Sequence, residues 1–315
     1  MMNYQEELVV TPHRHGLSAK AKKTLTFFAY ISPWLLAFIA FTIIPLFLSL
    51  VYSFSNVSMT TLSNGINFIG LKNYITIFTE DADFLQAVKN TFYYTIVKVV
   101  LLVILSLLAA LLLNSKIVGR KIFRVLFYLP ALIPAVSSAF LWKLLFSNGT
   151  NNVVNFFLSY LGIQPVNFLG NGTSAMGTII FIGIWSGLGP TMIIFLAAIQ
   201  GVEKDVMEAA SLDGAGPLRR FFHIIIPTIM PVLFFVVLTN VISSLQSYTE
   251  VKLLTGGGPG NSTITMSMSI VSNAFKTIGK KTLGYACAQG WIVFILTFIL
   301  TLLYVWNMNR TQKKG

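Results

Sequence analysis

The sequence predicts an all-α integral membrane protein with six transmembrane helices, and three observations lead to that prediction. Of the 315 residues, 55% are apolar and only 10% are charged, which leaves too few charges to solvate a water-soluble surface. The mean hydropathy is +0.75. Finally, six runs are long enough to cross a bilayer, which requires about 20 mostly apolar residues.

The predicted spans, in chain order, comprise residues 27–52, 93–113, 125–146, 175–198, 228–248 and 286–306. The first run is longer than the apolar core of a signal peptide and is not followed by a small-residue cleavage site, so we interpret it as an uncleaved span. Prolines lie within or beside four of the runs, and each interior proline removes a helical hydrogen bond. Kinks are therefore expected at these positions: Pro33, Pro45, Pro130, Pro134, Pro190, Pro227 and Pro231.

The distribution of Lys and Arg predicts the orientation. Of the 22 such residues, fourteen lie in the two tails and in loops 114–124 and 200–227, whereas six lie in the other loops. Cytoplasmic loops carry the excess of positive charge, so both termini and the 200–227 loop are expected in the cytoplasm. The expected organisation is a cytoplasmic tail at 1–24, a membrane domain at 25–306 and a second cytoplasmic tail at 307–315.

The most polar interior stretch, residues 203–227, lies between the fourth and fifth spans. Residues 203–212 are expected to form a short helix, because Glu203 and Asp205 would stand in its first turn, where the helix dipole favours negative charge. Gly214 predicts a turn, and Pro217 suits the start of a second helix. Two short helices joined at a glycine would form a compact knob suited to docking into a partner.

This stretch also holds certain residue types at fixed spacing: Glu208-Ala209-Ala210, Gly214, Ile224 and Ile226-Pro227. The pattern resembles the cytoplasmic EAA loop of permease subunits of binding-protein-dependent ABC importers, where Leu usually stands at the position of Ile226. Two outer loops, FIGLKNY at 68–74 and LTGGGP at 254–259, are similar to the carbohydrate-uptake, maltose-type group of the same family.

The resemblance implies a division of labour among several chains. This chain would be one of two permease subunits, paired with a second, related permease as a heterodimer. Two ATPase subunits would each grip one EAA helix, and an extracytoplasmic binding protein would deliver the solute. ATP and Mg would be bound by the ATPase partner, so no cofactor is expected in this chain, which would lie in the cell membrane of a bacterium or archaeon. The residues implied in coupling are Glu208, Ala209, Ala210, Asp213 and Gly214.

A pathway for a sugar or oligosaccharide is expected along the fourth and fifth spans. Four polar residues of the fifth span lie at offsets of three, four and seven, which places them on one helical face, and an Asn facing lipid would lack partners. An aromatic ring beside hydroxyl and amide groups suits a sugar. The maltose-type resemblance implies the same role for most of these residues, although Ser stands here at two positions where the family has Asn, which predicts a roomier or less polar site. The candidates are Trp185, Ser186, Gly187, Asn240, Ser243, Ser244, Ser247 and Tyr248.

Enzymatic chemistry is not expected, because the sequence has no Walker motif, zinc-ligand spacing or nucleophile elbow. None of the ten acidic residues lies in a predicted span, which argues against a proton-coupled carrier. Three alternatives stay open: an ABC permease for another solute such as a polyol phosphate, a carrier or channel that works alone, and a membrane scaffold without a pathway.

Overall fold

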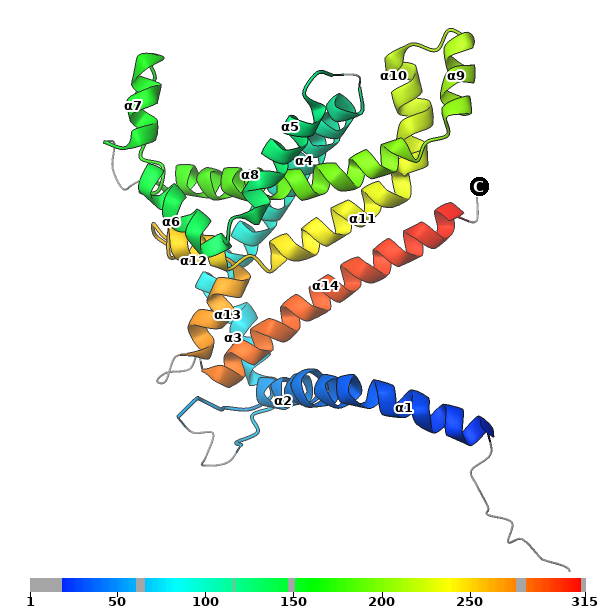
Figure 1. Cartoon of the computed structure of the whole chain (residues 1–315). Helices are drawn as coiled ribbons and strands as arrows, with labels where there is room; N and C mark the ends of the chain where they lie inside the picture. The colour runs from blue at the N-terminus through cyan, green and yellow to red at the C-terminus, as the bar shows by residue number, and fades with distance from the viewer. Residues whose placement is uncertain (1–18, 61–65, 116, 147–150, 276–281, 313–315) are drawn as a thin grey trace, which may run out of the picture. The chain divides into compact units, whose positions relative to one another are not determined.

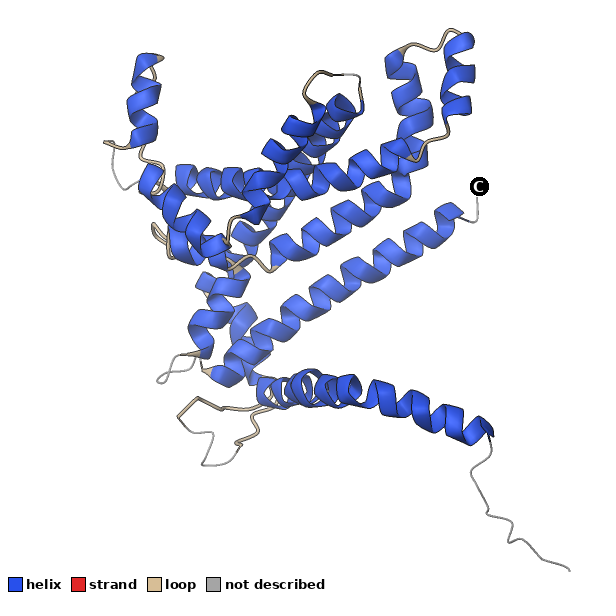
Figure 2. Ribbon diagram, viewed as in Figure 1, coloured by secondary structure: helices blue, strands red, loops and turns tan. Residues whose placement is uncertain are grey.

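A computed structural model describes residues 19–60, 66–115, 117–146, 151–275 and 282–312. The predicted all-α class is confirmed, since every regular element in these ranges is a helix (Figure 2). The first 18 residues of the expected N-terminal tail and residues 313–315 lie outside the described part of the chain. The chain divides into two units, Met1–Val51 and Tyr52–Gly315.

The first unit is built from one interrupted helix. α1 (Ala19–Phe38) continues through a π-helical turn, η1 (Ile39–Ile43), into α2 (Ile44–Ser53), whose last residues belong to the second unit. Pro45 explains the π turn, because its ring would clash with the carbonyl of Phe41, the central residue of η1, in a regular α-helix. Residues Thr26–Ser53 form the first candidate span.

The second unit holds the remaining helices, of which the α-helices are labelled in Figure 1. They are α3 (Lys72–Thr79), α4 (Ala82–Asn114), α5 (Arg120–Tyr128), the 3₁₀ helix η3 (Leu129–Leu132), α6 (Ala135–Leu145), α7 (Val153–Tyr160), α8 (Gly172–Gln200), α9 (Lys204–Leu212), α10 (Pro217–Arg220), the π helix η4 (Phe221–Ile225), α11 (Ile226–Leu245), α12 (Thr249–Leu254), α13 (Met266–Ala274) and α14 (Leu283–Gln312). Four further candidate spans lie here: Ala82–Asn114, Gly172–Gln200, Pro217–Leu245 and Leu283–Trp306. They confirm the second, fourth, fifth and sixth predicted spans.

The third predicted span, residues 125–146, is a bent pair of helices. The segments Arg120–Leu132 and Ala135–Leu145 meet at 97°. Ile133 between them is extended, with φ −78° and ψ 124°, the conformation that a following proline favours. Pro134 therefore ends the first segment and begins the second, so the kink expected at the prolines is a sharp break.

Prolines also shape the fourth and fifth spans. The π helix η4 precedes α11 for the same reason that η1 precedes α2, since His223 at its centre lies four residues before Pro227. Pro190 lies inside α8, where it deprives the Ser186 carbonyl of its usual helical donor. Irregular backbone thus accompanies Pro45, Pro134 and Pro227, whereas Pro33, Pro190 and Pro231 lie inside helices that stay α-helical.

Helices α4 and α8 pack against each other, and glycines of α8 allow close approach. An added Cβ at Gly187 of α8 would lie 3.2 Å from Leu102 of α4. An added Cβ at Gly189 would overlap the Phe127 carbonyl and lie 2.7 Å from the Tyr128 Cα, in the α5–η3 segment. Glycine permits this close approach because it has no side chain, which is how membrane helices commonly pack.

The 68–74 segment holds the chain after α2 in place. Asn73 is buried and donates hydrogen bonds to the carbonyls of Ser53 and Ser55, at 2.9 and 3.1 Å. Tyr74 lies 2.8 Å from the Ser53 hydroxyl. The polar residues of this segment therefore satisfy backbone groups of their own chain.

The glycine-rich loop after α12 is likewise fixed. Asn90 of α4 donates to the carbonyls of Asn261 and Ile264, at 2.9 and 3.0 Å. Inside the loop, Thr263 donates to the Gly258 carbonyl at 2.8 Å. Gly256 and Gly257 adopt φ of 63° and 91°, which residues with a Cβ rarely take. The loop is an ordered cap beside α4.

Candidate functional site

Helices α9 and α10 form the hairpin predicted between the fourth and fifth spans (Figure 1). α9 follows Glu203, and Pro217 opens α10, as expected. Gly214 has a φ of 75°, which confirms the predicted glycine turn. The Ala215 amide bonds the Ala210 carbonyl at 2.9 Å and the Gly214 amide bonds the Ser211 carbonyl at 3.2 Å. These two bonds make a Schellman motif, which requires a left-handed residue at Gly214.

The hairpin is internally braced and presents apolar side chains outward. Arg220 donates to the Ser211 hydroxyl at 2.6 Å, which joins α9 to the end of α10. Leu212 is 90% exposed, Leu218 75% and Phe222 60%. A group of exposed apolar side chains on a preformed element is typical of an interaction surface.

The predicted coupling residues lie on different parts of this hairpin. Asp213 and Gly214 are exposed at the turn, whereas Glu208 is the central residue of α9. Glu208 lines a pocket of about 610 Å³ together with Lys204 and with Arg120 of α5. In the part of the chain that the structure describes, Glu208 forms no ion pair with Lys204, the neighbour four residues earlier. Glu208 thus lies at the middle of α9, in a pocket shared with α5, and Gly214 lies at the tip of the hairpin.

The polar residues of the fifth span do not share one continuous helical face. α11 ends at Leu245, so Ser247 lies beyond the helix rather than on it, and its carbonyl accepts from Thr265 at 2.8 Å. Ser243 is exposed, while Ser244 is fully buried. The helix ends three residues before the predicted boundary at 248 because the chain turns into α12 there. The expectation of a single face is corrected accordingly.

Asn240 remains on α11, half-buried. Its amide donates to the Val236 carbonyl at 2.9 Å, one turn earlier in the same helix. The expected need of an amide for a partner is therefore met inside the helix. The carbonyl oxygen of the side chain is left to accept from another group.

Trp185 belongs to an aromatic cluster between α8 and α6. Its ring lies edge-to-face with Trp142, with centroids 5.1 Å apart, and Trp142 stacks on Phe146 at 5.3 Å. Two other candidates also serve packing: Gly187 lies against α4, and Tyr248 is a half-buried member of the apolar cluster around Ile179. Trp185, Trp142 and Phe146 thus form one aromatic cluster that joins α8 to the end of α6.

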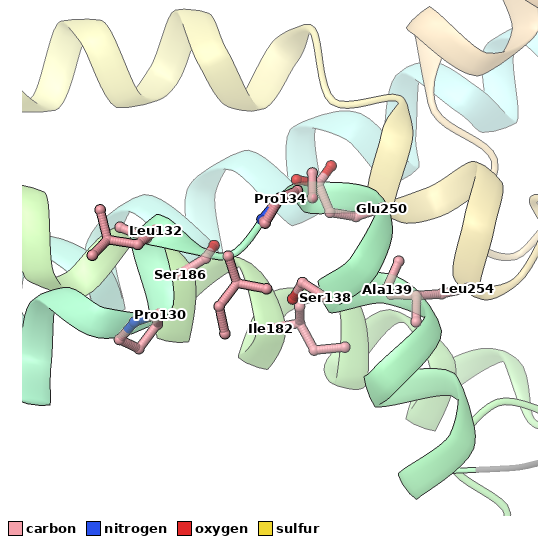
Figure 3. A pocket seen from close by; sticks show the side chains of 12 residues that line it. Pro130, Leu132, Pro134, Ser138, Ala139, Ile182, Ser186, Glu250 and Leu254 are labelled. Atoms are coloured by element: carbon pink, nitrogen blue, oxygen red, sulfur yellow. The ribbon is translucent and has the colours of Figure 1, made fainter.

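A pocket of about 400 Å³ lies where η3, α6, α8 and α12 meet, shown in Figure 3. Its lining is mostly apolar, with three polar side chains: Ser138 of α6, Ser186 of α8 and Glu250 of α12. Among the predicted pathway residues, only Ser186 lines it. The sequence reasoning missed Ser138 and Glu250, since the first lies in the broken span and the second beyond the end of the fifth.

Residues 102–313 match the family described as the inner membrane component of binding-protein-dependent transport systems. The chain belongs to this family. It is therefore a membrane-embedded permease subunit of an ABC importer, and its function is transport rather than an enzymatic reaction. Its dependence on a binding protein follows from the family.

The similarity to known proteins extends over nearly the whole length of this permease. It is 35% identical over 286 residues to the probable ABC transporter permease protein YesP of Bacillus subtilis, covering 90% of each chain. It is 32% identical to the arabinooligosaccharides transport system permease protein AraP of Halalkalibacterium halodurans, covering 98% of this permease and 97% of the relative. The fold matches a chain of a bacterial ABC transporter that imports the acidic polysaccharide alginate, with a TM-score of 0.79, 24% identity, and coverage of 92% and 97%.

Proposed function

We propose that this permease forms part of the pathway by which an ABC importer carries a sugar or oligosaccharide into the cell. The observation that carries the proposal is the pocket lined by Ser138, Ser186 and Glu250, with polar groups set among apolar walls. Sugars have apolar C–H faces and polar edges, so they suit such a lining. The name of the relative that transports arabino-oligosaccharides supports the same solute class.

Two buried polar atoms, one on α6 and one on α11, add support. Within the described residues, the Trp142 Nε1 donor and the Ser244 hydroxyl have no hydrogen-bond partner. Buried polar groups are normally paired, so an unpaired one in a transporter can serve a passing hydroxyl. Trp185 would offer its ring beside Trp142, and Asn240 the carbonyl oxygen of its side chain.

The energy for transport would enter through the α9–α10 hairpin. We assign Glu208, Ala209, Ala210, Asp213 and Gly214 to docking into an ATPase subunit, which would hold the ATP and Mg. The exposed Leu212 and Leu218 would be covered in that contact. The excess of Lys and Arg in the tails and this loop supports a cytoplasmic position for the hairpin and both termini.

A second, related permease would complete the pathway as a heterodimer, and a binding protein would deliver the solute from outside. Two differently tagged copies of this chain, expressed together with the partner subunits, test the pairing. We expect that neither tag recovers the other from an active complex. Efficient recovery of one tagged copy by the other would contradict the heterodimer and indicate that the permease pairs with itself.

The sugar pathway is tested by purifying the chain with its partners and measuring ATPase activity and uptake across a sugar panel. Trp185→Ala and Asn240→Ala, made separately, should lower sugar uptake while complex assembly and basal ATPase activity persist. Trp185→Phe is the matched control, because it keeps an aromatic face. Unchanged uptake and sugar preference in both alanine variants would leave these residues with a packing role alone.

A further inference from the structure

Glu250 lies near the middle of helix α8, although in the sequence it follows the end of the fifth predicted span. It shares a pocket with Ser186, the fifteenth residue of the 29-residue helix α8. With a rise of about 1.5 Å per residue, Ser186 is about 21 Å from either end of that helix. α12 carries Glu250 to this level because the chain turns inward after α11 and packs against α6 and α8. A carboxylate therefore lies beside the middle of a transmembrane helix, where ionisable groups are costly and usually functional.

The surroundings of this carboxylate leave its charge largely uncompensated. The Ser247 hydroxyl donates to its Oε2 at 3.4 Å, a long bond. No Lys, Arg or His lines the pocket, and in the described part of the chain none of these forms an ion pair with Glu250. The rest of the lining includes Pro130, Leu132, Pro134, Ile182 and Leu254 (Figure 3). A carboxylate among apolar groups gains strongly from any donor that enters.

We propose that Glu250 selects the solute by charge. Its oxygens accept hydrogen bonds from the hydroxyls of a neutral sugar or the ammonium of an amino sugar, and its charge opposes a sugar that bears carboxylate or phosphate groups. Like charges brought together in a site of low dielectric cost several kcal/mol, which excludes a wrong ligand effectively. The inference rests on the proposed sugar pathway and adds the substrate class: neutral or cationic saccharides, in contrast to the polyuronate carried by the importer of similar fold.

Three β-1,4-linked tetrasaccharides of the same length differ in charge: cellotetraose, the glucosamine tetramer and the mannuronate tetramer. Because the mannuronate tetramer also differs from cellotetraose in configuration at C2, the effect of charge is measured by how Glu250→Gln changes the affinity ratios. Their binding to the purified permease–ATPase complex, without binding protein, can be measured by saturation-transfer NMR at a pH where the amines are protonated. For the wild type we expect the mannuronate tetramer to bind at least about tenfold more weakly than cellotetraose. Glu250→Gln should remove most of that difference and weaken the glucosamine tetramer relative to cellotetraose.

Two matched variants accompany Glu250→Gln. Glu250→Asp keeps the charge and should keep the wild-type order of the three sugars. Glu80→Gln removes a carboxylate from a different pocket, one lined by Lys72 and Tyr285, and should also leave the order unchanged. If Glu250→Gln gives the wild-type affinity ratios, or if Glu80→Gln shifts them equally, charge selection by Glu250 is wrong.

The same titrations separate this inference from the function on which it rests. Sugar binding by the wild type with ratios insensitive to Glu250 overturns charge selection and leaves the sugar pathway standing. Failure of all three sugars to bind the wild type, together with no uptake of any sugar by the complete importer, overturns the proposed function and this inference with it. Tighter binding of the mannuronate tetramer by the wild type than by Glu250→Gln overturns charge selection directly.

Discussion

Tyr285 donates its phenolic proton to Asp81 at 2.6 Å, and both side chains are buried. The other oxygen of the same carboxylate accepts from the Phe84 amide at 3.1 Å and so caps the start of α4. One aspartate therefore joins the beginning of α4 to the beginning of α14, 204 residues further along the chain. This buried polar link ties together the starts of two long helices of the second unit.

Tyr285→Phe should destabilise the second unit by about 1.5–3 kcal/mol, since it removes a buried hydrogen bond to a charged group. Thermal unfolding of the purified complex in detergent measures the loss. Tyr74→Phe is the control, because the hydroxyl it removes lies 2.8 Å from the neutral Ser53 hydroxyl. Its cost should be about 0.5–1.5 kcal/mol. Equal shifts for the two variants would contradict the importance given to Asp81.

Gly189→Ala should weaken the packing of α8 against the α5–η3 segment. An added Cβ would overlap the Phe127 carbonyl and lie 2.7 Å from the Tyr128 Cα, so backbone must move. We expect a loss of about 1–3 kcal/mol, typical of overpacking. Gly177→Ala in the same helix is the matched control, because an added Cβ there meets nothing within 4 Å. It should be neutral or stabilise by up to about 1 kcal/mol through helix propensity, as judged by thermal unfolding.

The sequence predicts the elements whose signals are local. Hydropathy alone predicts the long helices. Gly214 predicts the turn of the hairpin, because glycine readily adopts a left-handed conformation, and Pro217 predicts the start of the second helix, because the first turn of a helix does not need its missing amide. Family resemblance then assigned the chain. These predictions depend on neighbours within a few residues, which the sequence displays directly.

The proposed solute site depends on contacts that are not local. The prolines predict a kink in the third span, but the sequence does not show that the bend reaches 97° near Pro134 and brings Ser138 and Ser186 into one pocket. Counting offsets along an ideal helix also extended α11 past its end at Leu245, so Ser247 was placed on the wrong element. Glu250 was read as lying outside the spans, because depth in the bundle follows from how α12 packs and not from its position in the chain.

Asn90→Ala should loosen the glycine-rich loop without unfolding the unit. It removes the two hydrogen bonds to the carbonyls of Asn261 and Ile264. The loop keeps its bonds to α4 from the Asn261 side-chain amide to Asp83 and from the Met266 backbone amide to Thr91, both at 2.9 Å. Hydrogen exchange across residues 256–265 should rise by about tenfold or more, consistent with a loss of roughly 1–2 kcal/mol locally. Gln86→Ala is the control, since its amide bonds the Asn90 side chain at 2.9 Å and, among the described residues, forms no hydrogen bond to the loop. Unchanged exchange in the loop would mean that Asn90 does not anchor it.

Gly214→Val should uncouple ATP hydrolysis from transport. At Gly214 an added Cβ meets nothing within 4 Å, so the effect would come from the φ of 75° alone. A β-branched residue in this left-handed region costs at least about 1–2 kcal/mol, and the turn would relax by breaking the Schellman bonds to Ala210 and Ser211. The hairpin tip would then lose its fixed shape. Gly214→Asn is the control, because Asn tolerates the same φ. We expect the valine variant to assemble but to transport less sugar per ATP hydrolysed, with the asparagine variant close to wild type. Normal transport stoichiometry in Gly214→Val would show that the ATPase does not depend on this turn, and loss of stoichiometry in both variants would point to a contact made by the glycine itself.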